Sequence, residues 1–307
     1  MRVRGMAERL IFSCLAAVFT LPAGAGELPP YAVARVPTPV FSDPAFPRLF
    51  GGNDGDVLGR DRCGQIRSLE FIAPVGSLFT VQGAVPGSSP PVWRVTTNEY
   101  PYPTAKGYFV DPRLLAPASA LHPQRARSLP PKEEILRRLR SSVGAPYVWG
   151  GNVRNGIPEL PLLYHPSSPL PTAMAAAWSL AGVDCSGLLY EASGGITPRN
   201  TSALIGYKNA LPLAGLAPQK ISASLLPLDL IVWNGHVMIV LDNGEVVESR
   251  LKCGVSGNGG VVIRPLLQAL NQLMKQRNAV NDYPTAPEEG KRAFIVRRWY
   301  PETPHKP

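Results

Sequence analysis

The sequence predicts an α+β protein in which a module of short β-strands precedes a domain of helices and antiparallel strands. Proline supplies 34 of the 307 residues, about twice its usual share, which disfavours an all-helical bundle. Residues 29–116 carry only short β-rich segments separated by proline and glycine. From residue 131 onward, helical patterns come first and strand patterns follow, an order typical of α+β domains.

The chain opens with a segment that we interpret as a signal peptide, residues 1–25. Arg2, Arg4 and Arg9 accompany the apolar run Leu10–Leu21, and small residues follow at the cleavage position. The run is too short to cross a bilayer, which takes about 20 apolar residues. We therefore expect an exported monomer, either periplasmic, envelope-associated or secreted, with no integral membrane segment.

Charge and histidine spacing narrow the possible partners. The net charge of +9 favours an anionic envelope surface for an exported protein. No run of Lys or Arg exceeds two residues, so we expect no nucleic-acid partner. The sequence has no CxxC or HExxH spacing, which predicts that the protein uses no metal and no other cofactor. The four histidines are scattered along the chain: His122, His165, His236 and His305.

The first module, residues 26–116, is expected to be a small β-barrel. The segment Gly107–Leu115 resembles the closing strand and 3₁₀ turn of bacterial SH3 modules, so the module is predicted to be SH3-like. A Pro-rich linker, residues 117–130, follows it. The strands that we expect in the module are Tyr31–Val36, Leu69–Ala73, Ser77–Val81, Val92–Thr96 and Tyr108–Val110.

The second domain, residues 131–307, begins with a helix that has an acidic first turn, a basic last turn and a stop at Gly144. Asp242-Asn243-Gly244 predicts a two-residue hairpin turn in which Leu241 pairs with Val246. Helices are expected from Cys185 to Gly194, from Ser202 to Lys208 and from Leu266 to Met274. Strands are expected at Leu228–Trp233, His236–Leu241, Glu245–Ser249, Gly260–Ile263 and Ala293–Trp299.

Cys185 is the candidate nucleophile. It opens a predicted helix, where unpaired backbone amides and the helix dipole favour a thiolate. Ser186 and Gly187 are small and leave the sulfur accessible. Cys14 leaves with the signal peptide, so an odd number of cysteines remains and one is expected to be a free thiol. A buried or disulfide-bonded Cys185 is the structural alternative.

His236 and Glu248 are the candidate partners of that thiol. His236 opens a predicted strand, from which its imidazole could hold the thiol proton and return it to a leaving amine. Glu248 lies on the next strand, and we expect it opposite Ile239 on the face of His236, where it could orient the imidazole. A histidine at a strand edge and a solvated carboxylate are the alternatives.

Five segments between residues 130 and 300 resemble the NlpC/P60 family of cell-wall cysteine peptidases. They occur in the family's order and at plausible spacing. The segments are Pro146-Tyr147-Val148-Trp149-Gly150-Gly151, Asp184-Cys185-Ser186-Gly187-Leu188, Thr197-Pro198-Arg199-Asn200-Thr201-Ser202, Pro227-Leu228-Asp229-Leu230-Ile231 and His236-Val237-Met238-Ile239.

The resemblance implies a papain-like catalytic domain and a thiol protease. Its substrate would be the γ-D-glutamyl–diamino acid amide of peptidoglycan stem peptides, cleaved through a thioester. Cys185 would be the nucleophile and His236 the general base. Glu248 falls where the orienting polar residue belongs, although many members have histidine there. Tyr147, Asp184 and Ser186 would bind substrate, with Tyr147 close to the oxyanion and Asp184 contacting the free amino end of the stem.

Residues 152–183 form an insertion that is long for this family. We interpret it as a surface insertion packed by its own apolar residues, and a lid over the cleft is the alternative. Cys63 and Cys253 would lie in different domains and could form a disulfide between them. Two other functions remain open: a wall-binding protein without catalysis, and an acyltransferase or amidase acting on another amide or ester.

Overall fold

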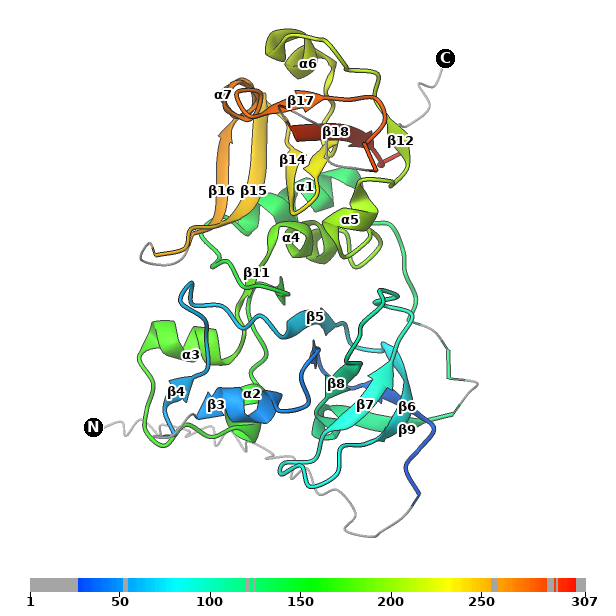
Figure 1. The fold of residues 1–307 in the computed structure, drawn as a ribbon, viewed down its shortest axis with the longest axis vertical. Helices are drawn as coiled ribbons and strands as arrows, with labels where there is room; N and C mark the ends of the chain where they lie inside the picture. The colour runs from blue at the N-terminus through cyan, green and yellow to red at the C-terminus, as the bar shows by residue number, and fades with distance from the viewer. Residues whose placement is uncertain are drawn as a thin grey trace, which may run out of the picture.

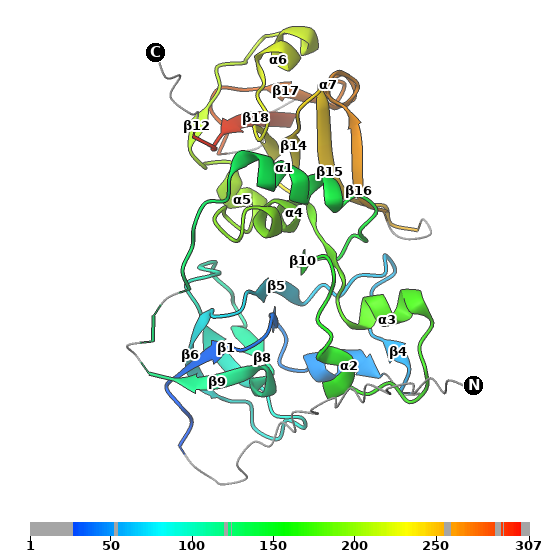
Figure 2. The same cartoon turned by 180° about the vertical axis from the view of Figure 1, so that it is seen from behind.

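The structure is a computed structural model that describes residues 27–51, 55–119, 122–123, 125–254, 259–285, 290 and 292–301. The predicted signal peptide, residues 1–25, lies outside the described residues. The molecule has two halves (Figure 1). Each half is built on one antiparallel sheet, with seven strands in the N-terminal half and six in the main path of the C-terminal half. Helix α4 and strands β5 and β11 lie where the halves meet in Figure 1, and Figure 2 shows β10 at the same place.

The N-terminal half contains a seven-stranded sheet in the order β5-β2-β8-β7-β6-β1-β9. Among the described residues no pairing joins β5 to β9, so the SH3-like barrel stays a prediction. The short strands β3 and β4 pair with each other outside this sheet. The bounds are β1 (Tyr31–Ala34), β2 (Thr38–Phe41), η1 (Phe46–Leu49), β3 (Phe50–Gly51), β4 (Val57–Leu58), β5 (Leu69–Ala73), β6 (Leu78–Ala84), β7 (Trp93–Thr96), β8 (Tyr108–Val110), η2 (Pro112–Leu114) and β9 (Leu115–Ala118).

All five strands predicted for this module are present, and the 3₁₀ turn at Pro112–Leu114 is confirmed. Strand β2 was not predicted, because Pro39 lies inside it and proline usually ends a strand pattern. Residues Thr38–Phe41 are nevertheless all buried. Phe41 pairs with Phe109 of β8, and Val40 pairs with Phe71 of β5. Burial of apolar side chains on both sides therefore overrides the local signal.

The insertion folds around the N-terminal half. It contains β10 (Asn152–Val153), α2 (Leu160–Leu163), α3 (Thr172–Trp178) and β11 (Gly182–Val183). Trp178 and Leu160 share one apolar cluster with Phe41, Phe46 and Phe50. The prediction that the insertion packs by its own apolar residues is wrong in this respect, because the β module supplies half of the cluster. Figure 1 shows α2 beside β3 and α3 beside β4, and Figure 2 shows α2, α3 and β4 together from behind.

The C-terminal half is a sheet covered by helices on both faces, which confirms the α+β fold class. Its strand order is β12-β18-β13-β14-β15-β16, and β17 pairs with the edge of β18 in parallel. The bounds are α1 (Lys132–Ser141), α4 (Cys185–Ala192), α5 (Thr201–Leu204), β12 (Asn209–Ala210), α6 (Pro218–Ser224), β13 (Leu230–Trp233), β14 (His236–Val240), β15 (Glu245–Leu251), β16 (Gly259–Pro265), α7 (Leu266–Leu273), β17 (Arg277–Ala279) and β18 (Arg292–Arg298).

Two apolar clusters lie on opposite faces of this sheet. One contains α1, α4 and the alternate residues Val237 and Ile239 of β14. The other contains α6, α7 and the intervening residues Met238 and Val240. Successive side chains of a strand point to opposite faces, so each strand residue between the helix layers is buried. Helix α5 is shorter than the predicted Ser202–Lys208, and α6 was not predicted.

The turn between β14 and β15 differs from the prediction by one residue. The Leu241 N–H donates to the Glu245 carbonyl at 2.9 Å, and Ile239 pairs with Val247. Asp242-Asn243-Gly244 is therefore a three-residue loop, with Asn243 and Gly244 both at positive φ. The predicted pairing of Glu248 with Ile239 is wrong. In the corrected register, the alternation of side chains along the strands places Glu248 and His236 on the same face of the sheet.

Cys63 and Cys253, whose pairing the sequence left open, form a disulfide across 190 residues of sequence. Next to it, the Gln65 side chain donates to the Tyr147 carbonyl at 3.4 Å and accepts from the Trp149 N–H at 2.9 Å. The disulfide thus joins the β module to the residues that follow β15, and Gln65 joins the module to the segment around Tyr147 and Trp149.

Replacing both Cys63 and Cys253 with serine is expected to lower the free energy of unfolding by about 2–4 kcal/mol, since the bond restricts the unfolded chain. Urea denaturation of the mature protein checks this value. Reductant provides the control: it should destabilise the wild type to the same extent and leave the double variant unchanged. Equal free energies for the two proteins without reductant would contradict the prediction.

Candidate active site

Cys185 begins α4, as predicted, and it is the one free cysteine among the described residues. Asp184 caps this helix, because its Oδ1 accepts from the Gly187 N–H at 2.6 Å. A Cβ at Gly187 would lie 1.9 Å from the Gly151 carbonyl oxygen, so only glycine fits there. The backbone thus holds the thiol in the first helical turn, where the dipole favours a negative charge.

His236 begins β14 and lies between the thiol and a carboxylate. Its Nε2 is 2.7 Å from Oε2 of Glu248. Burial lowers the pKa of His236, but hydrogen bonds and charge interactions with Cys185 and Glu248 outweigh it and raise the pKa to about 9. The imidazolium therefore stabilises the fold below pH 6.5, and this contribution is lost as the pH rises through about 9.

Glu248 of β15 is 3% exposed and remains ionised. Burial raises its pKa, but the hydrogen bond and charge of His236 and the charges of Arg264 and Arg250 outweigh burial, so the net pKa lies below its ordinary value. The structure thus brings the three predicted residues Cys185, His236 and Glu248 together in one row.

Tyr147 lies beside the same thiol. Burial, together with the negative charges of Asp184 and Cys185, raises the pKa of the Tyr147 phenol. The phenol therefore keeps its proton at neutral pH and can donate a hydrogen bond. Tyr147, Cys185 and the loop residue Gly235 line one cavity of about 300 Å³.

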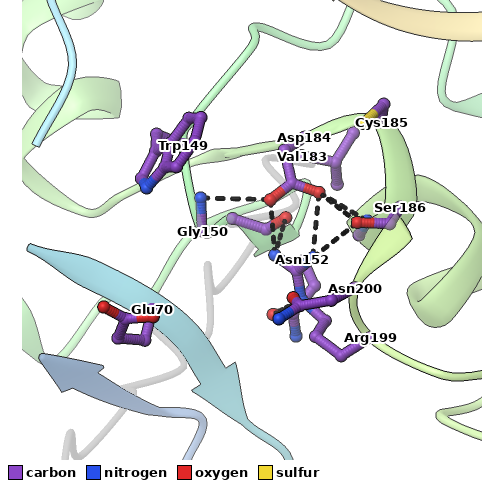
Figure 3. Close-up of polar contacts among 12 residues, drawn as sticks. Glu70, Trp149, Gly150, Asn152, Val183, Asp184, Cys185, Ser186, Arg199 and Asn200 are labelled. Carbon is purple, nitrogen blue, oxygen red and sulfur yellow. Dashed lines mark hydrogen bonds and ion pairs between the residues drawn. The ribbon is translucent and has the colours of Figure 1, made fainter. Parts of the chain in front are cut away.

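Asp184 and Ser186 line this cavity too, but their polar atoms are largely occupied (Figure 3). The Arg199 guanidinium donates to both Asp184 oxygens, at 2.9 and 2.7 Å, and to Ser186 Oγ at 3.0 Å. The Gly150 N–H donates to Asp184 Oδ2 at 3.1 Å. Arg199 is 2% exposed, so this ion pair is internal. The substrate-binding roles of Asp184 and Ser186 stay predictions.

The Asp184 network also connects the two halves of the molecule. Asn152 Oδ1 accepts from Arg199 Nε at 3.1 Å and from the Ile72 N–H at 2.9 Å, and its Nδ2 donates to the Ile72 carbonyl at 2.8 Å. Strand β5 of the β module is therefore fixed next to the helix that carries Cys185.

Among the cavity residues that were not predicted as site residues, Glu70, Tyr100 and Asn200 form one hydrogen-bonded group. The Tyr100 hydroxyl is 3.2 Å from Glu70 Oε2 and accepts from Asn200 Nδ2 at 2.9 Å. Burial raises the pKa of Tyr100. Asn200 belongs to the Pro198-Arg199-Asn200 stretch that the sequence singled out. Glu70 and Tyr100 carry no local motif, and only the docking of β5 brings them here.

Within the described ranges, no group of three or more His, Cys, Asp or Glu side chains is placed to hold a metal ion. The same residues include no helix that is both long and apolar enough to cross a membrane.

No protein-family model and no curated protein matches this chain. Solved structures give weak likenesses. The peptidoglycan hydrolase RipB of Mycobacterium tuberculosis is 23% identical, with 54% of this chain and 63% of RipB covered and a TM-score of 0.30. This chain thus spans less than two thirds of the RipB chain.

Two other solved structures are of NlpC/P60 proteins. An NlpC/P60 family protein from Bacillus cereus is 15% identical, with 89% of this chain and 64% of that chain covered and a TM-score of 0.33. RipD of M. tuberculosis, described as a non-catalytic NlpC/P60 domain protein adapted to peptidoglycan binding, is 18% identical, with coverages of 54% and 95% and a TM-score of 0.30. Because these scores are low, the chemistry of the site rests on the geometry of the cavity.

Proposed function

We propose that this protein is an exported cysteine peptidase that hydrolyses the γ-D-glutamyl–diamino acid amide of peptidoglycan stem peptides. The observation that carries the proposal is the row formed by Cys185, His236 and Glu248 at a cavity of about 300 Å³. The resemblance of the five sequence segments to NlpC/P60 peptidases supplies the bond and the substrate.

The first half of the proposed reaction forms a thioester. The Cys185 thiolate adds to the amide carbon, and the carbonyl oxygen takes up the negative charge. The backbone N–H of Cys185 and the Tyr147 hydroxyl are the donors proposed for that oxygen, and one such donor is typically worth about 2.7–4 kcal/mol of barrier. The His236 imidazolium then gives its proton to the leaving amine as the C–N bond breaks.

The second half hydrolyses the thioester. The imidazole of His236, now neutral, takes a proton from water, and the resulting hydroxide adds to the thioester carbon. Collapse of this intermediate expels the thiolate and leaves the imidazolium protonated, and the γ-carboxylic acid that is released loses its proton to solvent. Glu248 stays ionised throughout and stabilises the imidazolium.

The proposed substrate enters with its free amino end toward Glu70 and Tyr100. Glu70 supplies a carboxylate at that end of the cavity, and Tyr100 and Asn200 supply hydrogen-bonding groups. An ammonium group is complementary to such a surface, whereas an acylated amino end would bury the Glu70 carboxylate without a counter-charge. Asp184 would add a second carboxylate, shared with Arg199.

The domain division is part of the proposal. Residues 26–116 would form the β module, 117–130 the linker and 131–307 the catalytic domain with its insertion at 152–183. In the described part of the linker, Arg125 and Arg127 pair with Glu99 of the β module at 3.2 and 2.8 Å. Glu99 also accepts from Tyr190 of α4 at 3.1 Å, so this linker is fixed to both halves.

Digestion of defined stem peptides, read by mass spectrometry, tests the function. The mature protein is expected to give two fragments whose masses add up to the substrate plus one water, cut after the γ-D-glutamyl residue. The same peptide with an acetylated amino end is the matched control, and we expect its cleavage to be at least about tenfold slower.

Each other outcome of the digest contradicts the proposal. Transfer of the acyl group to an added amine, without hydrolysis, would make the protein an acyltransferase. Binding to sacculi with no cleavage of any stem peptide would make it a non-catalytic wall-binding protein.

A further inference from the structure

Two basic side chains flank the Glu248 carboxylate on the side away from His236. Arg264 Nη2 lies 2.6 Å from Oε1, and Arg250 Nε lies 3.7 Å from the same atom. Oε2 is 2.7 Å from His236 Nε2. One oxygen of the carboxylate therefore faces the imidazole, and the other faces the guanidinium groups.

Arg264 is itself held in place. It lies on β16, two residues beyond Val262, which pairs with Glu248. Its Nη1 donates to Gln272 Oε1 of α7 at 2.8 Å, and its Nη2 lies 3.7 Å from Met238 Sδ of β14. Contacts with α7 and β14 hold the guanidinium beside the carboxylate, so its positive charge faces Oε1 while Oε2 faces the imidazole.

We propose that Arg264 is a positioning residue for catalysis: its guanidinium holds the Glu248 carboxylate ionised and with Oε2 turned toward the His236 imidazole. This proposal rests on the proposed function. Arg264 does not line the cavity around Cys185, so it acts through Glu248 and not through contact with the substrate.

The charge of Arg264 also affects the pKa of His236. The charged and titratable groups facing this pair are Cys185 of α4, Arg250 of β15 and Arg264 of β16. A cation that shares the carboxylate repels the proton on the imidazole. Loss of the Arg264 charge alone should therefore raise the pKa of His236 further. Loss of the orientation would remove the Glu248 hydrogen bond, which lowers that pKa and slows the chemical step.

The test is an NMR titration of the histidine rings in the mature protein. The chain has four histidines, so the His236 signal can be assigned from a His236→Asn variant. Arg264→Gln is expected to shift the measured pKa of His236 by at least about 0.5 unit, upward if only the charge is lost and downward if the carboxylate also turns away from the imidazole. Arg264→Lys, which keeps the charge, is expected to return it to the wild-type value. Arg264→Met takes the place of the glutamine variant if that variant does not fold.

Arg298→Met is the matched control. Arg298 pairs with Asp229 at 2.8 Å, and the two side chains are 22% and 2% exposed, against 19% and 3% for Arg264 and Glu248. The control thus removes one charge and one half-buried ion pair from the same sheet without touching Glu248. It should leave the His236 titration unchanged. If both neutral variants shift it equally, or if neither shifts it, the proposal is overturned.

Kinetics on the stem peptide add a second measurement. Arg264→Gln is expected to lower kcat by about tenfold or more and to change KM by less than about twofold. If the wild type cleaves the peptide and Arg264→Gln leaves kcat unchanged, the proposal is overturned. If the wild type cleaves no stem peptide, the proposed function fails, and the titration alone still decides the role of Arg264.

Discussion

Replacement of Cys185 with alanine is expected to abolish cleavage of stem peptides, with a fall in kcat of at least about 10⁴-fold. The thiolate forms the bond that splits the reaction into two steps, and among the described residues no other free cysteine exists to replace it. Cleavage rates on a defined stem peptide measure the effect. Thermal unfolding serves as the control, because the variant removes one small buried atom and should melt close to the wild type.

The same variant gives a second measurement that does not depend on substrate. Part of the raised pKa of His236 comes from Cys185 and part from Glu248. Removal of the thiol should therefore lower the pKa of His236 from about 9. A wild-type cleavage rate, or an unshifted titration, would show that Cys185 and His236 do not act as a pair.

The residues of the candidate catalytic row could be predicted because each has a local signal. Cys185 follows an Asp that can cap a helix and precedes a glycine that permits close packing, and both features are in the sequence. His236 and Glu248 lie on two strands joined by an Asn-Gly turn. The exact turn could not be predicted, because the same residues suit a two-residue and a three-residue loop. Side-chain packing of Val246 and Val247 decides between them.

The end of the cavity that Glu70 and Tyr100 line could not be predicted from local signals. Glu70 and Tyr100 lie in a module whose local pattern shows only strands, and their role depends on where β5 docks. That docking rests on Asn152, on the Cys63–Cys253 disulfide and on the packing of Trp178 against Phe50. Each of these contacts joins residues about 80 or more positions apart, and no single-sequence pattern carries such pairings.

Replacement of Arg199 with methionine is expected to cost about 3–5 kcal/mol of stability. The guanidinium is buried and makes five hydrogen bonds, to Asp184, Ser186, Asn152 and the Gly151 carbonyl. Without it, the Asp184 carboxylate keeps only backbone donors and the Ser186 hydroxyl. A buried charge that loses its partner is costly. Urea denaturation, with the slope m compared between proteins, measures the loss.

Arg137→Met is the control for this variant. Arg137 also donates two hydrogen bonds to one carboxylate, that of Glu134, but its side chain is 65% exposed. Solvent screens such a pair, so its loss should cost far less stability than the loss of Arg199. A cost for Arg199→Met as small as that of Arg137→Met would contradict an internal ion pair at the base of α4.

The partner of Arg199 can be tested by a double variant. In Arg199→Met with Asp184→Asn, no uncompensated charge remains, and the amide can still accept from the Gly187 N–H. The double variant should therefore be more stable than Arg199→Met alone, although Asp184→Asn by itself is destabilising. Purely additive losses would mean that the two side chains do not interact. Arg199 would then contribute through Asn152 and the docking of β5, and not through the carboxylate beside the nucleophile.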